Sequence, residues 1–167
     1  MNESAQLKDL KNKYIFWDID GTLAPYRFND HIADPEGTNN GMSIKEIEDG
    51  IFLTREPSKH MQKVLETCSA KENIIIGHYC SIKKEIQDKH IWLDKYYPTI
   101  KERLLIHNSK SKADTILQYC KEHNINLQDI VFVDDVTPFL QEAERKGIKS
   151  YHISSFLDWN FQFTQNV

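Results

Sequence analysis

The sequence predicts an α/β protein in which helices cover both faces of a parallel sheet of about five strands. Short apolar runs rich in β-branched and aromatic residues alternate with segments whose apolar residues repeat at helical spacing. Strands that alternate with helices in this way form right-handed βαβ units, which build parallel sheets. Two acidic motifs directly follow two of the apolar runs. They therefore fall at the edge of the sheet where such proteins bind ligands.

The composition is typical of one globular domain. The chain has 167 residues, of which 40% are hydrophobic and 28% charged, and we interpret 1–167 as a single domain with its own core. The net charge of -4 argues against a broad nucleic-acid-binding surface, because such binding depends on neutralising phosphates. No apolar run reaches the length of a membrane span or a signal-peptide core. We therefore expect a cytoplasmic protein without membrane contact.

The first half of the chain contains two predicted strands with a helix between them. Residues 14–17 and 74–77 are short apolar runs bounded by polar residues, as buried strands are. A helix is predicted after the N-cap residue Ser58, because apolar residues recur there at helical spacing. These residues are Met61, Val64, Leu65 and Cys68.

The second half continues the alternation. A helix capped by Ser81 runs toward Pro98, and a second one is capped by Ser111. A third begins near Pro138 and ends at Gly147 after a basic last turn. The predicted strands of this half are 103–107, 130–133 and 150–153.

Two regions interrupt this pattern. Residues 23–55 are too long for a simple connection, and we interpret them as an insertion over the candidate active site. Within it Ser43 begins a capping box, which predicts one short helix that Gly50 ends. The tail 154–167 alternates aromatic and other residues. We favour an extra strand docked on the domain, and the alternative is a contact between the subunits of a homo-oligomer.

The first acidic motif is Asp-Ile-Asp-Gly-Thr, with Asp18, Asp20, Gly21 and Thr22. Residues two apart in an extended segment point to the same side, so the two carboxyl groups converge on one substrate. One can remain ionised as a nucleophile while the other carries a proton, provided that their surroundings separate their pKa values. Gly21 permits a tight turn that directs backbone N–H groups, together with the Thr22 hydroxyl, toward phosphate oxygens.

Alternative chemistries fit the sequence poorly. A calcium loop that starts at Asp18 needs an acidic fifth, a glycine sixth and a glutamate twelfth residue, but Thr22, Leu23 and Asn29 stand there. No cysteine is followed by arginine six positions later, as cysteine-dependent phosphatases require. Glycine-rich nucleotide loops and zinc-hydrolase histidine patterns are absent as well. A purely structural use of the two aspartates in turn capping stays open.

The second acidic motif, Asp134-Asp135, ends the apolar run 130–133. Mg²⁺ prefers hard oxygen ligands and retains several waters, which suits paired acids at the end of a strand. Adjacent acids also stabilise the N-terminus of a following helix, an alternative that needs no metal.

The two motifs, in this order, resemble the first and last signatures of the haloacid dehalogenase superfamily, and the resemblance covers about residues 14–153. It implies a three-layer α/β/α Rossmann-like domain, here with a small insertion in place of a full cap domain, and a Mg²⁺-dependent phosphatase. Asp18 would attack phosphorus and form an aspartyl-phosphate, and Asp20 would act as general acid and then as general base. The resemblance also implies a Mg²⁺ site made by Asp18, Asp20 and Asp135, with Asp134 acting beside it or through water.

The same resemblance assigns further residues to phosphate binding. Lys112 matches the superfamily's lysine, which offsets the charge of the nucleophile and the phosphate, and Lys110 is the alternative. Relatives carry serine or threonine after the second strand, where this chain has Gly77-His78. The backbone N–H of Gly77, the His78 ring or the Ser81 hydroxyl would have to replace that group.

Substrate contacts are expected at the borders of the insertion, from Tyr26, Arg27 and Arg55, because arginine binds phosphate or carboxylate through paired hydrogen bonds. We expect hydrolysis of a phosphomonoester of unknown size. Two alternatives stay open. One is a catalytically weak module that binds Mg²⁺ or a phosphorylated partner, and the other is phosphoryl transfer to an acceptor other than water.

Overall fold

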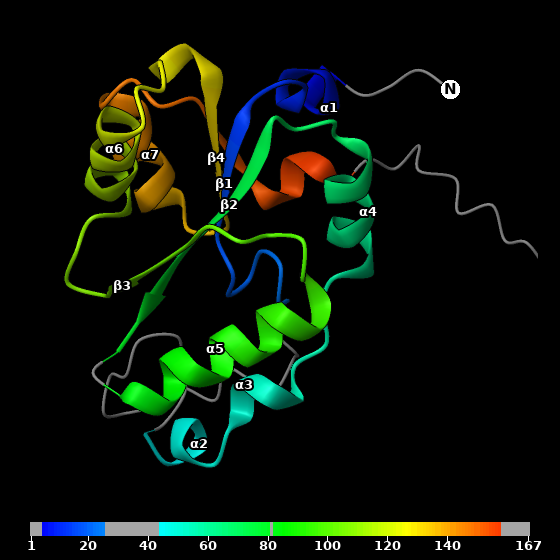
Figure 1. The fold of residues 1–167 in the computed structure, drawn as a ribbon, viewed down its shortest axis with the longest axis vertical. Helices are drawn as coiled ribbons and strands as arrows, with labels where there is room; N and C mark the ends of the chain where they lie inside the picture. Colours follow the sequence, from blue (N-terminus) through cyan, green and yellow to red (C-terminus); the bar gives the residue numbers. More distant parts are fainter. Residues whose placement is uncertain (1–4, 26–43, 81, 158–167) are drawn as a thin grey trace, which may run out of the picture.

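The computed structural model describes residues 5–25, 44–80 and 82–157. A five-stranded parallel sheet in the order β3-β2-β1-β4-β5 forms its centre, as the alternation of strands and helices predicted. The strands are β1 (Tyr14–Trp17), β2 (Glu72–Tyr79), β3 (Arg103–His107), β4 (Ile130–Asp134) and β5 (Ser150–His152). Because β1 lies between β2 and β4 (Figure 1), the first acidic motif stands at the middle of one sheet edge.

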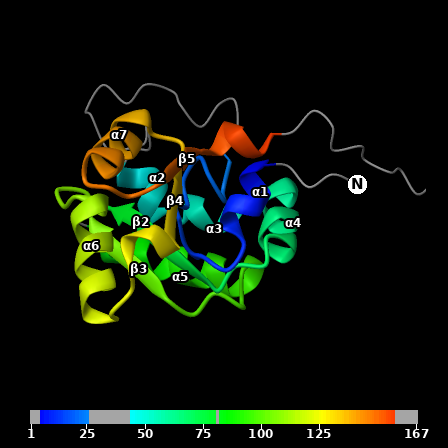
Figure 2. The same cartoon turned by 90° about the horizontal axis from the view of Figure 1, so that it is seen from above.

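The α-helices lie on both faces of the sheet and beyond one edge. They are α1 (Ala5–Leu10), α2 (Ile44–Glu48), α3 (Ile51–Thr54), α4 (Lys59–Thr67), α5 (Lys83–Tyr96), α6 (Lys112–Glu122) and α7 (Thr137–Arg145). One face packs α6 and α7 over Phe16, and the other packs α1 and α4 over Trp17 (Figure 2). Neighbouring residues of β1 therefore point into two separate apolar cores.

The helix α5 departs from the usual position of a crossover helix. Together with α2 and α3 it crosses below the carboxyl end of β1, instead of lying flat on a face of the sheet (Figure 1). A small apolar cluster around Ile47 and Phe52 joins α2 and α3 to the segment that directly precedes α5. Trp92 and Leu93, in the second half of α5, reach the core beneath α4. The first half of α5 is thus held over the sheet edge that carries the acidic motifs.

Most predicted elements are confirmed. Ser58 caps α4 by accepting a hydrogen bond from Met61 N at 3.2 Å, and Ser111 caps α6 in the same way from Asp114 N at 3.1 Å. The strand predicted at 74–77 is longer in the structure and ends at Tyr79.

Two helices were not predicted. The segment predicted to be an insertion contains α3 as well as α2, because the chain re-enters a helix after Gly50, whose φ is 83°. With four residues, α3 is too short for a helical repeat to be recognised. The N-terminal segment, for which no element was predicted, forms α1, which buries Leu7 and Leu10.

The tail begins with a 3₁₀ turn, η3 (Ile153–Phe156). Phe156 is buried, with its ring centroid 6.2 Å from that of Trp17, and its carbonyl accepts a hydrogen bond from His60 at 2.6 Å. Residues 158–167 lie outside the described part of the chain, so the docked strand and the subunit contact both stay predictions. No helix in the described ranges is both long enough and apolar enough to cross a membrane.

Phe156→Ala is expected to lower the free energy of unfolding by about 3 kcal/mol, because it removes a buried ring and leaves a cavity beside Trp17. Leu157→Ala is the matched control, at a side chain that is 58% exposed, and should cost less than about 0.5 kcal/mol. Urea unfolding followed by circular dichroism measures both. Equally small losses would show that this turn contributes nothing to the core.

Candidate active site

Three carboxylates meet where β1 and β4 end. Asp18 follows β1, Asp134 is the last residue of β4, and Asp135 comes next. The backbone N–H of Asp18 donates to the Val133 carbonyl at 3.0 Å, which continues the β1–β4 pairing by one residue and sets the two motifs side by side. One oxygen from each of the three acids lies within 4.8 Å of the others. Such a group can hold one cation.

Lys112 joins two of these carboxylates. Its Nζ lies 2.6 Å from Asp18 Oδ1 and 2.7 Å from Asp134 Oδ2, and it sits 5.1 Å from the centroid of the Phe139 ring. Lys112 is the first residue of α6, so the Ser111 cap that starts the helix also aims this side chain at the acids. Lys110 is exposed. Of the two lysines considered from the sequence, the structure brings Lys112 to the acidic group.

Burial controls the protonation of these acids. It raises the pKa of Asp18 to about 7, although Lys112 opposes the shift. Burial and the neighbouring Asp18 raise the pKa of Asp135 to about 6, and burial also raises that of Asp134. Each shift records the cost of holding negative charge away from water. A cation in the middle of the three acids would remove that cost.

Asp20 stands apart from this group and is bound by two other cations. Arg55 Nη1 lies 2.8 Å from Asp20 Oδ1, and Lys89 Nζ lies 2.8 Å from Asp20 Oδ2. Burial alone would raise the pKa of Asp20, but Lys89 and Arg55 outweigh it and hold the pKa below its usual value. The Asp20 carboxylate is therefore not among the three that are placed to share a cation. Arg55, expected to contact substrate, instead pairs with Asp20.

Lys89 was not identified from the sequence. Its ammonium also contacts Glu85 Oε1 at 2.8 Å and donates to the His78 carbonyl at 2.5 Å, so it has three acceptors around it. Glu85 and Lys89 are four residues apart on α5, a spacing that normally indicates a surface ion pair. The pair is buried because α5 lies below the sheet. No local pattern in the sequence predicts that position of the helix.

Thr22 and Gly21 complete the turn after β1. The Thr22 hydroxyl is buried and has no hydrogen-bond partner, and the same is true of Asp135 Oδ1. Gly21 has a φ of 82°, and its N–H donates to the Ala24 carbonyl at 2.9 Å. A Cβ at this position would lie 2.1 Å from Asp135 Oδ2. Glycine is therefore required by the close approach of Asp135, and the two unpartnered oxygens are available to bind a ligand.

The residues proposed to replace the hydroxyl after the second strand have other contacts. Gly77 lies inside β2, where a Cβ would come within 2.9 Å of Ile19 Cδ1. His78 donates its Nε2 hydrogen to the Lys110 carbonyl at 2.9 Å, and burial lowers its pKa to about 4. A neutral His78 with that donor engaged has little to offer a phosphate. The remaining candidates, Ser81, Tyr26 and Arg27, lie outside the described residues.

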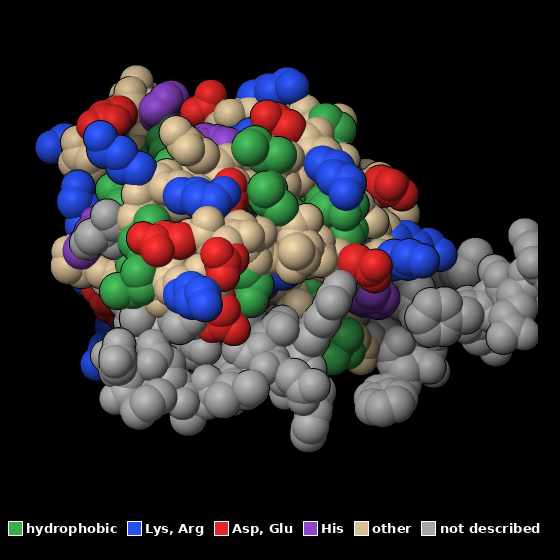
Figure 3. Space-filling model, turned by 90° about the horizontal axis from the view of Figure 1, so that it is seen from below, with side chains coloured by type: hydrophobic (Ala, Val, Ile, Leu, Met, Phe, Trp, Pro, Cys, Tyr) green, Lys and Arg blue, Asp and Glu red, His purple; other side chains and the backbone are tan. Residues whose placement is uncertain are grey.

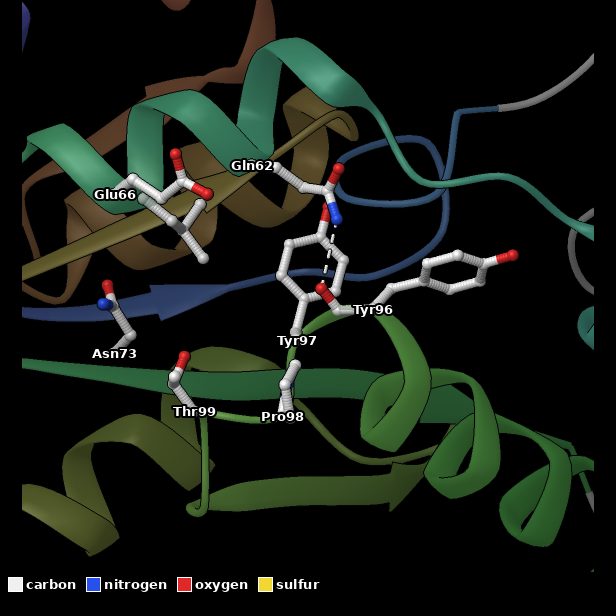
Figure 4. Close-up of a pocket in the computed structure, with 8 residues that line it drawn as sticks. Gln62, Glu66, Asn73, Tyr96, Tyr97, Pro98 and Thr99 are labelled. Atoms are coloured by element: carbon white, nitrogen blue, oxygen red, sulfur yellow. Dashed lines mark hydrogen bonds between the residues drawn. The ribbon is translucent and has the colours of Figure 1, made fainter.

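A hollow of about 360 Å³ lies elsewhere, between α4 and the end of α5. In Figure 4 the Tyr97 ring points toward Gln62, which donates to the Tyr96 carbonyl at 3.1 Å. None of the four aspartates Asp18, Asp20, Asp134 and Asp135 lines this hollow. Figure 3 views the molecule from the side of α2, α3 and α5, where the described basic, acidic and apolar side chains are intermixed without a broad basic patch.

Gly21→Ala is expected to destabilise the fold more than Gly50→Ala. The φ angles are 82° and 83°, so both changes carry a left-handed strain of about 1 kcal/mol. At Gly50 the nearest atom is 3.4 Å from the new Cβ, so only Gly21→Ala creates a clash, with a further cost of about 1–3 kcal/mol. Urea unfolding measures the difference, and a second change, Asp135→Ala, should relieve it. Equal losses at both glycines would contradict the close approach.

Comparison with known proteins found no matching family model and no matching curated protein. Solved structures do match. A haloacid dehalogenase-like hydrolase from Streptococcus pneumoniae superposes with a TM-score of 0.56 at 15% identity, over 83% of this chain and 82% of that one. Another hydrolase from Streptococcus pneumoniae gives 0.57 at 12% identity, over 84% and 92%.

A third match is a haloacid dehalogenase family enzyme from Bacteroides thetaiotaomicron, an aspartate-to-alanine mutant in complex with magnesium and inorganic phosphate. Its TM-score is 0.54 at 12% identity, over 83% of this chain and 92% of that one. These similarities confirm the fold predicted from the two acidic motifs. The chain has the fold of the haloacid dehalogenase superfamily.

Proposed function

We propose that the protein is a Mg²⁺-dependent phosphatase that hydrolyses a phosphomonoester through an aspartyl-phosphate on Asp18. The observation that carries this proposal is the group formed by Asp18, Asp134, Asp135 and Lys112 at the ends of β1 and β4. Removing three carboxylates from water beside a single ammonium costs free energy unless a further cation offsets their charge. The group therefore favours a site that binds a metal ion together with an anionic substrate.

The donor set fits Mg²⁺. All candidate ligands are hard carboxylate oxygens, and Asp135 Oδ1 is buried without a partner. Asp18 and Asp135 would hold the ion. Asp134 already accepts hydrogen bonds from Lys112 at 2.7 Å and from the Val136 N–H at 2.8 Å, so its role is to orient the lysine and the following turn. When bound, Mg²⁺ neutralises charge on the phosphate and on Asp18.

Charge balance supports a divalent ion. Five carboxyl groups belong to the cluster, namely Asp18, Asp20, Glu85, Asp134 and Asp135, and its three cations are Arg55, Lys89 and Lys112. With all groups ionised, two negative charges remain unmatched among these described residues. One Mg²⁺ offsets them. The structural relative from Bacteroides thetaiotaomicron was crystallised with magnesium and phosphate, which is in keeping with this interpretation.

Asp18 is the nucleophile in this proposal, and Lys112 keeps it oriented through the contact to Oδ1. Attack on phosphorus breaks the bond to the leaving oxygen and gives an aspartyl-phosphate, which water then hydrolyses. The unpartnered Thr22 hydroxyl is available to donate to a phosphate oxygen. It is thus a phosphate ligand supplied by the first motif itself, and it lessens the need for a hydroxyl after β2.

Asp20 is the general acid and base. Held by Arg55 and Lys89, it is a carboxylate, which is the form that accepts a proton from the attacking water. To protonate the leaving group first, Asp20 needs its pKa raised, and the negative charge of a bound phosphoester has that effect. Tyr26 and Arg27 stay proposed substrate contacts, whereas the pairing of Arg55 with Asp20 assigns Arg55 to the acid/base instead.

Asp18→Asn is expected to lower the release of phosphate from 4-nitrophenyl phosphate by at least about 10³-fold, because it removes the nucleophile. Activity of the native chain should require Mg²⁺ and disappear with EDTA. Asp129→Asn, at an aspartate whose side chain is 43% exposed, is the matched control and should remain fully active. Equal turnover by the native chain and Asp18→Asn would refute the proposal.

The alternatives give other results in the same assay. Mg²⁺ binding by calorimetry without hydrolysis across a panel of phosphoesters would identify a binding module. Product formation that depends on an added alcohol would identify transfer to an acceptor other than water.

A further inference from the structure

The pairing of Asp20 with Arg55 and Lys89 brings together three parts of the chain. Asp20 lies in the turn after β1, Arg55 directly follows α3, and Lys89 lies in the middle of α5. Arg55 and Lys89 are 3% and 1% exposed, so neither is a surface charge that meets Asp20 by chance. Each cation binds a different oxygen of the carboxylate, which fixes both the position and the rotation of the Asp20 side chain.

Both cations are themselves held in place. The buried ring of Phe52 in α3 lies under the two of them, with its centroid 4.7 Å from Lys89 Nζ and 5.2 Å from Arg55 Cζ. The carbonyl of Arg55 accepts a hydrogen bond from Trp92 Nε1 in α5 at 2.9 Å. Lys89 is further fixed by Glu85 and the His78 carbonyl. Cations above an aromatic face in a desolvated site are strongly oriented.

We propose that Arg55 and Lys89 are positioning residues for the general acid, and that α3 and α5 set the geometry in which Asp20 meets the leaving group. This inference rests on the proposed function. Proton transfer to a leaving oxygen requires the acid to lie within hydrogen-bond reach in one orientation. A flexible aspartate in a turn would not hold that geometry, whereas one bound at both oxygens does.

The dependence of the rate on the leaving group separates this role from a structural one. Phenolate is a poor leaving group and needs a proton during departure, whereas 4-nitrophenolate leaves readily without one. A change that only misplaces the acid therefore slows phenyl phosphate far more than 4-nitrophenyl phosphate. General damage to the fold, or to the nucleophile, slows both equally. Comparing kcat/KM restricts the measurement to steps up to formation of the phosphoenzyme.

The experiment measures kcat/KM with both substrates for Lys89→Met, combined with Glu85→Gln so that no unpaired charge is buried. We expect a loss of about 100-fold with phenyl phosphate and of less than about tenfold with 4-nitrophenyl phosphate. Arg55→Lys keeps the charge but not the planar donor geometry. It should also lower kcat/KM more with phenyl phosphate than with 4-nitrophenyl phosphate, but by a smaller factor. Lys84→Met combined with Asp88→Asn is the matched control, since these residues form another ion pair of the same helix at 2.8 Å, and the two changes together should affect neither substrate.

A second comparison tests whether the two cations act through Asp20. In a chain that already carries Asp20→Asn, the changes at Lys89 and Glu85 should add no further leaving-group bias. Equal losses with both substrates, or effects that multiply with Asp20→Asn, would overturn the inference and leave the phosphatase proposal intact. If the native chain releases no phosphate from either substrate, the proposed function fails and this inference fails with it.

Discussion

The burial of many charges at one edge of a parallel sheet is the constraint on which the rest of the structure depends. Carboxylates removed from water must be paired or must bind metal, and the turns after β1 and β4 place several of them together. Lys112 reaches them because Ser111 caps α6, which makes Lys112 the first residue of the helix. Arg55 and Lys89 reach Asp20 because α3 and α5 lie below β1 instead of on a face of the sheet.

This arrangement divides the two carboxylates of the first motif between different surroundings. Asp18 belongs to the group that is short of positive charge, and burial raises its pKa to about 7. Asp20, two residues later, is bound by two cations that lower its pKa against the effect of burial. The proposed roles need the reverse, an ionised Asp18 and a protonated Asp20, and a bound cation and a bound phosphoester would shift the two pKa values in those directions. The surroundings of Asp18 and Asp20 differ because α3 and α5 bring Arg55 and Lys89 to Asp20.

The strands and the acidic motifs could be predicted from the sequence because their signals are local. Apolar runs such as 14–17 and turn residues such as Gly21 depend on near neighbours in the chain. Lys89 could not be found in this way, because a lysine four residues after a glutamate on a helix looks the same whether it faces solvent or a buried acid. Its role depends on where α5 lies, which is a property of the whole fold. Arg55 and Asp20 were both singled out, but Arg55 as a substrate contact and not as the partner of Asp20.

The most direct test of the central claim is to trap the covalent intermediate. The protein is mixed with 4-nitrophenyl phosphate and Mg²⁺, quenched, and treated with borohydride, which reduces an acyl phosphate to an alcohol, and the modified residue is then located by peptide mass spectrometry. We expect the reduced side chain to be the one at position 18. Turnover with that position unmodified, or with the modification at Asp20 or another carboxylate, would contradict the assignment of Asp18 as the nucleophile.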